Sequence, residues 1–444
     1  MNQEYMKEKP ILPLLLSMAA PMMLSMLVQS LYNIIDSIFV AKLGEDALAA
    51  VSLVYPLQNL ITAWTVGFGV GLNARIAYFL GAGDKEKADR ATSQGVFLGA
   101  VHGIVVMVLG LILAPYYLRM FTENQRVLEW GTQYAAIIFG MSAVLIVGVT
   151  FEKVFQAEGK MVPTMAGMLA GCVTNIILDP LFIFGIGWFP RMGVRGAAFA
   201  TGLGWVVTLV FYLVYYWKGG ITLNIRGREM RPTGEICGKM YRVGIPAALN
   251  MALPSFLISA LNGILGAYSQ MYVVILGIYY KLQSFIYLPA NGIIQGMRPL
   301  ISYNHGAGEK ERVGKIFQIC LRLILGMMCL GMVLCLGFPK ELMGMFTSNA
   351  ATIREGEKAL RIISLGFAVS SVSVVCAGAL EALGRGMASL CISLLRYVVI
   401  ILPSAWILSR LFEETGVWCS FVLAETLTAA AAMGIWRGRK EEEA

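Results

Sequence analysis

Two aspartates lie inside long apolar segments of this 444-residue chain. Asp36 falls in the apolar stretch 13–40 and Asp179 in the stretch 161–186. An ionisable side chain within an apolar span is costly, and by default it marks a pathway for ions, protons or substrates. These two carboxylates are therefore the first candidates for chemistry.

Asp36 belongs to a series of polar residues at helical spacing. Gln29, Tyr32, Asn33 and Asp36 follow one another at three- and four-residue intervals. Residues spaced in this way share one face of a helix. Since the rest of the segment is apolar, this face is predicted to look into a helix bundle or a cavity.

Asp179 has a polar neighbour on its own helix. Asn175 precedes it by four residues, so the two side chains share a face. Pro180 follows directly and removes one backbone hydrogen bond from the helix. A polar pair beside a local break in the helix again suggests a binding position.

A pair of acids in a membrane protein suggests coupling to an ion. Two carboxylates in one low-dielectric pocket repel each other, and a proton or cation bound between them relieves the repulsion. A change in this charge can bias a two-state helix, such as one bent at Pro21. The alternative is that Asp36 and Asp179 are structural polar groups that hold helices together.

The composition indicates that these residues lie in a membrane. Hydrophobic residues make up 57% of the chain and charged residues 14%, against roughly 25% charged in soluble domains. Spans of roughly 20 residues are needed to cross a bilayer. The predicted twelve spans cover about 13–40, 47–75, 92–118, 127–152, 161–186, 192–217, 244–267, 270–297, 316–338, 361–381, 388–411 and 416–436.

The chain also repeats itself at a shift of 225 residues without a gap. The shift places Gly67, Gly71 and the turn Gly81-Ala82-Gly83 on Gly292, Gly296 and Gly306-Ala307-Gly308, and it places Pro21 on Pro246. The glycines inside apolar helices predict close helix packing, and the Gly-Ala-Gly turns predict helix ends.

The repeat predicts an all-α membrane protein with two pseudo-symmetric six-helix lobes. The expected divisions are an N-terminal lobe (1–217), a cytoplasmic linker (218–243), a C-terminal lobe (244–436) and a cytoplasmic tail (437–444). Duplicated bundles in a membrane are typical of alternating access around a shared site.

The second lobe lacks the acidic candidates of the first. At the positions equivalent to Asp36, Asn175 and Asp179 it has Leu261, Ile400 and Ser404. The predicted coupling site therefore belongs to the first lobe alone.

Two cations of the second lobe are further candidates. Lys281 and Arg396 lie within predicted spans, where a cation needs an acidic partner, carbonyl groups or a wet cavity. Lys281 is a candidate for timing the conformational switch, and Arg396 is closer to a structural residue. Glu152, Glu381 and Glu425 lie near span ends and are expected to reach water.

Charge distribution predicts the orientation. With both termini in the cytoplasm, inner loops and tails hold 21 of the 35 Lys and Arg residues and outer loops hold ten. This excess agrees with the positive-inside rule and predicts that both termini lie in the cytoplasm. The basic residues lack interleaved stacking aromatics, which argues against nucleic-acid binding.

Two distant histidines and no Glu-x-x-His pattern argue against a bound metal, and no cofactor is expected.

Three stretches carry a family resemblance: PMMLSMLVQSLYNIIDSIFVAKLGEDALAAV at 21–51, NIILDPLFIFG at 175–185 and GAAFATG at 196–202. They resemble the multidrug and toxic compound extrusion (MATE) family, in its DinF-like and MepA-like prokaryotic branch, across all twelve spans. The resemblance implies a first-lobe cation-coupling site of Asp36, Asp179 and Asn175, with Tyr32, Gln29 and Thr201 nearby, and helix bending at Pro21.

This chain differs in one respect from some members of the family that it resembles. NorM-like relatives carry acidic residues in the seventh and tenth helices, whereas this chain has none in 244–267 and none in the tenth span before Glu381. This difference favours proton coupling in the first lobe over a sodium site in the second.

The expected function is secondary active export of amphipathic, cationic organic compounds in exchange for protons or sodium, by a monomer embedded in lipid and without covalent chemistry. A flippase for lipid-linked precursors is the alternative in the same superfamily, although only Lys281 and Arg396 are available as cavity cations. A membrane-embedded polyprenyl transferase would need paired Asp-x-x-Asp motifs for magnesium, and the sequence has none.

Overall fold

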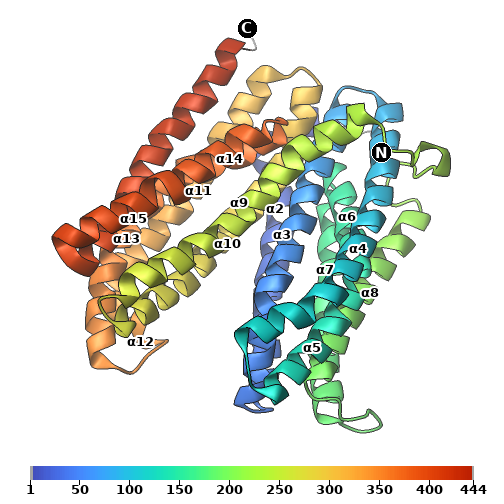
Figure 1. Ribbon diagram of the computed structural model, residues 1–444. Coiled ribbons are helices and arrows are strands. Elements are labelled where there is room, and N and C mark those ends of the chain that lie inside the picture. The colour runs from blue at the N-terminus through green and yellow to red at the C-terminus, as the bar shows by residue number, and fades with distance from the viewer. Residues whose placement is uncertain (1–3, 443–444) are drawn as a thin grey trace.

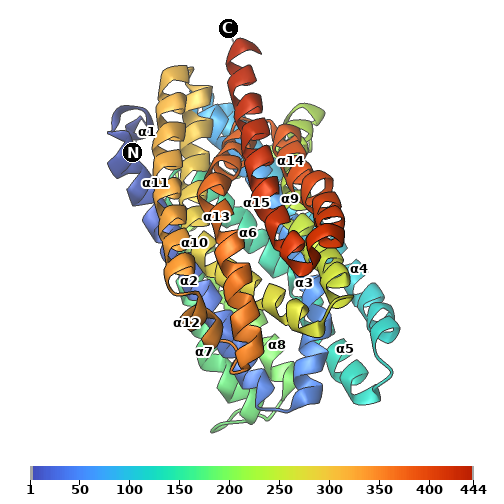
Figure 2. The same ribbon diagram turned by 90° about the vertical axis from the view of Figure 1, so that its left-hand side faces the viewer.

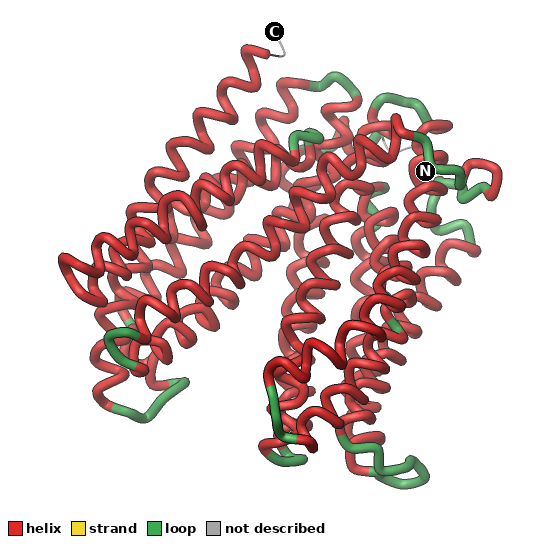
Figure 3. Tube along the Cα trace, in the orientation of Figure 1, coloured by secondary structure: helices red, strands yellow, loops and turns green. Residues whose placement is uncertain are grey.

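The computed structural model describes residues 4–442, and within them it consists of helices and loops without a strand (Figures 1 and 3). The helices of the first half are α1 (Tyr5–Glu8), α2 (Ile11–Ala41), α3 (Glu45–Gly81), α4 (Lys85–Phe121), α5 (Gln125–Gly140), α6 (Ser142–Ala157), α7 (Met161–Phe184) and α8 (Val194–Trp217). Those of the second half are α9 (Gly234–Gly266), α10 (Gln270–Gly306), α11 (Lys310–Gly337), α12 (Pro339–Gly344), α13 (Ala350–Ala382), α14 (Gly386–Leu394) and α15 (Leu402–Glu442). A 3-10 turn, η1 (Gly227–Glu229), precedes α9, and a π-helical segment, η2 (Leu395–Ile401), joins α14 to α15.

The helices account for twelve membrane crossings. Ten helical segments of the described residues are long and apolar enough to span a bilayer, and the pair α5 and α6, bent by 44°, forms one more. The last of the ten, Gly386–Gly438, contains non-helical backbone at Phe412 and Glu413 and turns back there, so it supplies two crossings. The predicted all-α membrane fold of two six-helix lobes is therefore confirmed.

The two lobes form a V. Helices α2 to α8 make one bundle and α9 to α15 the other (Figure 1). The bundles converge at the end where both termini lie and diverge toward the end that carries α12 and the α4–α5 loop (Figures 1 and 3). Such an arrangement leaves one end of the interface closed and the other open.

Two seams join the lobes where they converge. One is formed by α2 against α10, which Figure 2 shows side by side, and the other by α3 against α9. The shift of 225 residues maps α2 onto α9 and α3 onto α10, so the two seams are equivalent by pseudo-symmetry.

The duplicated glycines lie in these seams. A Cβ on Gly67 would be 2.5 Å from the backbone nitrogen of Ala248, and one on Gly292 would be 2.9 Å from that of Met23. Met23 and Ala248 are themselves related by the shift. The lobes therefore touch backbone to backbone, which only residues without a side chain allow, and the predicted close packing at Gly67 is confirmed.

The Gly-Ala-Gly turns end helices as predicted. Helix α3 ends at Gly81 and α10 at Gly306, and Gly83 and Gly308 adopt φ values of +74° and +76°. A left-handed residue directly after a helix is a common C-terminal cap, and glycine adopts it without steric cost. Asp84 then caps α4 by accepting a hydrogen bond from the Lys87 backbone N–H at 3.0 Å.

The linker between the lobes is bound to the first lobe. The Glu158 carboxylate accepts hydrogen bonds from the backbone N–H groups of Thr222 (2.8 Å) and Leu223 (2.9 Å), and Asp89 accepts from that of Asn224 (2.9 Å). Burial raises the pKa of Glu158, and these donors oppose that rise. Helix α9 begins at Gly234, within the predicted linker of residues 218–243.

We expect Gly67→Ala to lower the free energy of unfolding by about 1–3 kcal/mol, the usual cost of an added methyl group in close packing. Thermal unfolding of the purified protein in detergent measures the change. Gly314→Ala in α11 is the matched control, because nothing lies within 4 Å of its Cβ position. Alanine there should be neutral or stabilising by up to about 1 kcal/mol. Equal midpoints for the two variants would contradict the proposed backbone contact.

Candidate functional site

The first lobe brings most of the predicted polar residues together. The Asn175 amide lies between Asp179 on its own helix and Thr201 on α8. In the orientation that satisfies every partner, its nitrogen donates to Asp179 Oδ2 at 3.1 Å, and its oxygen accepts from the Thr201 backbone N–H (3.1 Å) and hydroxyl (3.2 Å). All three residues are buried.

Asp36 completes this cluster from α2. Its carboxyl group lies close enough to that of Asp179 for the two charges to interact. Asp36 Oδ1 is buried and receives no hydrogen bond from the part of the chain that the structure describes. Two ionised carboxylates repel each other and cannot donate a hydrogen bond to one another, so a proton or a cation between the two groups relieves the repulsion.

Small residues on α7 and α8 hold the cluster in place. A Cβ on Gly204 would be 2.8 Å from the carbonyl oxygen of Gly171, and one on Gly196 would be 2.6 Å from the backbone of Phe182. This close approach of α8 to α7 brings Thr201 within reach of Asn175. The segment GAAFATG at 196–202 therefore has a direct packing role.

A cavity of about 100 Å³ adjoins the cluster. Gln29 and Tyr32 from α2, Glu152 from α6, Asn175 from α7 and Thr201 from α8 contribute to its lining. The predicted polar face thus opens into a cavity, as expected for a binding position.

Asn33 does not join this group. Its side chain is exposed, and its amide donates to the Gln29 carbonyl of its own helix at 2.9 Å. Such a bond serves the helix backbone rather than the site.

A buried ion pair borders the same cavity, which sequence reasoning missed. Lys153 Nζ lies 2.8 Å from Glu152 Oε1 and donates to Gln156 Oε1 at 3.0 Å, while the Gln156 amide donates to Glu152 at 2.8 Å. All three side chains are buried. The expectation that Glu152 reaches water is therefore wrong, because the adjacent lysine neutralises it inside the lobe.

The second lobe buries two further ion pairs. Arg298 lies 2.5 Å from Glu381, which also accepts from Asn250 at 3.0 Å, and Arg396 is paired with Glu425. Glu381 and Glu425 are both buried, so the expectation that they reach water is wrong as well. The predicted candidate Arg396 has an acidic partner on α15 and is neutralised by it.

The two lobes contain equivalent cavities. A cavity of about 160 Å³ in the second lobe shares five positions with the one in the first lobe at the shift of 225 residues. These pairs are Val149 and Val374, Glu152 and Ala377, Met168 and Ser393, Gly171 and Arg396, and Cys172 and Tyr397. The Arg396 side chain thus occupies the position that a glycine leaves open in the first lobe.

Lys281 lies apart from both cavities. Its side chain is exposed, and its Nζ lies 5.9 Å from the centre of the Phe346 ring. No carboxylate of the described residues pairs with it, so the acidic partner, one of the three environments expected for this lysine, is not found among them. A cation over an aromatic face is a favourable contact that needs no such partner.

Pro21 lies inside α2, which continues as one helix from Ile11 to Ala41. The Ser25 hydroxyl donates to the Pro21 carbonyl at 2.8 Å. A proline within a helix lacks the N–H for its own backbone bond, which weakens the helix locally. Bending at Pro21 during a functional cycle stays a prediction.

The described residues contain no group of three or more His, Cys, Asp or Glu side chains placed to hold a metal ion. The acidic cluster of the first lobe consists of the two carboxylates alone. Its chemistry is therefore that of a two-carboxylate site.

The fold and site define a multi-pass membrane protein of two pseudo-symmetric six-helix lobes with an acidic cluster in one of them. The MatE family model matches residues 21–181 and again residues 246–407. These matches cover most of both repeats, and the chain belongs to the multidrug and toxic compound extrusion (MATE) family. Members of this family are transport proteins.

Two curated relatives match this chain over almost the whole of its length. The multidrug export protein MepA of Staphylococcus saprophyticus is 27% identical over 430 residues, which covers 97% of this chain and 94% of that protein. MepA of Staphylococcus aureus is 28% identical over 431 residues with the same coverage.

Solved structures share the fold. A MOP superfamily transporter from Pyrococcus furiosus superimposes with a TM-score of 0.92 at 24% identity, covering 99% of this chain and 97% of that one. An outward-facing multidrug resistance MATE family transporter gives the same score, identity and coverage.

We expect Glu425→Leu to destabilise the protein by about 3–5 kcal/mol, because it leaves the buried Arg396 guanidinium without its partner. The double variant Arg396→Met/Glu425→Leu should recover most of this loss, because it removes both charges. Thermal unfolding in detergent of the wild type, both single variants and the double variant forms a complete cycle. Additive losses in the double variant would show that the pair is not coupled.

Proposed function

We propose that this chain is a secondary active multidrug exporter that exchanges amphipathic, cationic organic compounds for protons, with sodium as the alternative coupling ion. The names of the MepA relatives, multidrug export proteins, support export of such compounds. The duplicated bundles support alternating access. We place the protein in the cytoplasmic membrane of a prokaryote, with small organic compounds and lipid as its partners and as a monomer.

One observation carries the proposal of ion coupling. Glu152, Glu381 and Glu425 are buried acids within the spans, and each has a Lys or Arg partner. Asp179 is also buried, but its charged neighbour is a second acid, Asp36. An acidic pair without a cation is a site that a proton or sodium ion can occupy and leave.

The other site residues act around this pair in the proposal. Asn175 and Thr201 fix the Asp179 carboxylate through the amide bridge, and Tyr32 and Gln29 line the cavity beside it. Occupation of the pair removes the repulsion between α2 and α7. We infer that this change is transmitted along α2 to its weak point at Pro21.

The proposed orientation follows from charge and shape. With both termini in the cytoplasm, as the excess of Lys and Arg in inner loops indicates, the diverging ends of the lobes face the outside. The conformation is then outward-open, with the two glycine seams closing the cytoplasmic end. In this scheme the lobes 1–217 and 244–436 move as two bodies, and the tail 437–444 stays in the cytoplasm.

The internal charges favour an exporter over a flippase for lipid-linked precursors. In the cavity of the second lobe, Arg298 and Arg396 are each paired with a glutamate. No free cluster of cations remains there to bind an anionic lipid carrier. We therefore keep export of cationic compounds as the single proposed function.

We expect Asp36→Asn and Asp179→Asn each to abolish transport while leaving the fold intact, because amides preserve the shape but cannot bind a proton. Transport is followed as export of a fluorescent cationic dye from proteoliposomes, first under an imposed pH gradient and then under an imposed sodium gradient. Thermal unfolding of each variant checks that it remains folded.

Asp46→Asn is the matched control for these variants. Asp46 lies at the start of α3, is partly exposed and lies 3.6 Å from Arg126, away from the acidic cluster. It should transport like the wild type. Wild-type transport by both Asp36→Asn and Asp179→Asn would refute coupling through this pair.

A further inference from the structure

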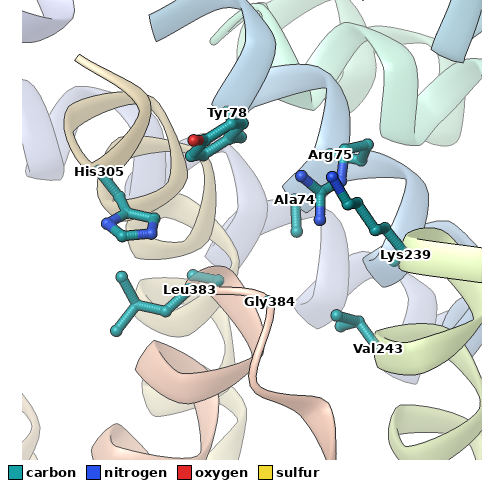
Figure 4. Close-up of a pocket in the computed structure, with 10 residues that line it drawn as sticks. Ala74, Arg75, Tyr78, Lys239, Val243, His305, Leu383 and Gly384 are labelled. Carbon is teal, nitrogen blue, oxygen red and sulfur yellow. The ribbon is translucent and has the colours of Figure 1, made fainter. Parts of the chain in front are cut away.

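A basic pocket lies between the lobes at the end where they converge. It has a volume of about 170 Å³ and is formed by α3 of the first lobe and by α9, α10 and the α13–α14 turn of the second. Its charged and polar lining consists of Arg75, Tyr78, Lys239 and His305 (Figure 4). A cavity of this volume has room for a polyatomic anion together with water.

Arg75 has unused hydrogen-bonding capacity in this pocket. Its guanidinium lies 5.3 Å from the centre of the Tyr78 ring and 5.5 Å from that of Phe79, but within the described chain it forms no ion pair or hydrogen bond. Its Nε is buried without an acceptor. A guanidinium presents five N–H donors in a planar fork that matches carboxylate and phosphate groups.

The surrounding charges leave the pocket positive. Lys239 lines it together with Arg75, and His305 adds a group that becomes positive when protonated. The nearby carboxylate is that of Glu235, which is exposed and 3.8 Å from Lys239. One solvated carboxylate does not neutralise two cations that share one pocket, so their repulsion favours an added anion.

We propose that this pocket binds a phosphate-type oxyanion, either the phosphodiester of an acidic lipid headgroup or a free phosphate group. Arg75 supplies the bidentate contact and Lys239 a second charge, while Tyr78 and His305 line the opposite side. This site is separate from the Asp36–Asp179 pair and does not depend on the proposed transport function.

Binding there joins the two lobes. Arg75 is on α3 of the first lobe, and its Nη2 lies 3.9 Å from the Cβ position of Gly384 in the second. Lys239 and His305 belong to the second lobe. An anion held between these groups therefore stabilises the conformation in which this end of the interface is closed.

The test is a titration of the purified full-length protein in a neutral detergent at constant ionic strength. The two probes are inorganic phosphate and dihexanoyl phosphatidylglycerol, with dihexanoyl phosphatidylcholine as the zwitterionic lipid control, which has no net charge. Calorimetric titration gives the dissociation constant, and the thermal midpoint reports stabilisation. We expect Arg75→Gln and Lys239→Gln each to weaken binding roughly tenfold or more, since each removes a charge-assisted contact.

Arg90→Gln is the matched control. Arg90 lies on α4, partly exposed and 3.4 Å from Glu86, outside the pocket, so this variant should bind like the wild type. Binding of inorganic phosphate would identify a free-anion site, and binding of phosphatidylglycerol alone would identify a lipid-headgroup site.

Two outcomes would overturn the proposal. One is the absence of binding of either probe to the wild type, a result that does not depend on how any variant folds. The other is equal binding or equal stabilisation in the wild type, Arg75→Gln and Lys239→Gln, which would reduce the effect to general stabilisation by phosphate as a salt.

Discussion

The cost of an unneutralised charge inside a membrane is the constraint on which this architecture depends. Water is not available in the hydrocarbon core to solvate a carboxylate, so each buried acid needs a partner within its lobe. Glu152 finds one in the next residue, while Glu381 and Glu425 find theirs on other helices. Asp179 departs from this pattern, because its neighbour is Asp36. We therefore expect function at this pair of acids, which lacks the cationic partner that the other buried acids have.

The second constraint is the contact between the lobes. Backbone-to-backbone approach at Gly67 and Gly292 brings the helices of each seam into close contact at these positions. A contact made by a glycine can separate and rejoin without a rotamer change at that position, whereas interdigitated side chains resist such motion. The same glycines that close one end of the interface therefore suit it to repeated opening. Because of the duplication, both seams have such glycine contacts, and the two seams lie on opposite sides of the molecular axis.

Helical periodicity in the sequence predicted which polar residues share the site, but the sequence did not predict which charged residues are paired around it. Helical spacing placed Asn175 beside Asp179, and the structure has them bonded, because residues four apart on a helix are neighbours in any fold. The position of Glu381 along its helix could be predicted, but its partner Arg298 comes from α10, 83 residues away. Hydropathy gives depth along a single helix and contains nothing about which helices face each other. For the same reason the surroundings expected for Lys281, namely an acidic partner, carbonyl groups or a wet cavity, did not include the aromatic ring that lies beside it.

The equivalent cavities explain why one lobe carries the acidic pair. Gly171 lines the first-lobe cavity beside Asn175, while at the equivalent place the second-lobe cavity is lined by the Arg396 side chain, which is held by Glu425. Duplication places a cavity at a related position in each lobe, and a two-lobe rocking motion needs only one of them to sense an ion. Once Arg396 and Glu425 neutralise each other, the second pocket has no charge to lose or gain during the cycle. Under the proposed ion coupling, the charge changes of the cycle are therefore confined to Asp36 and Asp179 in the first lobe.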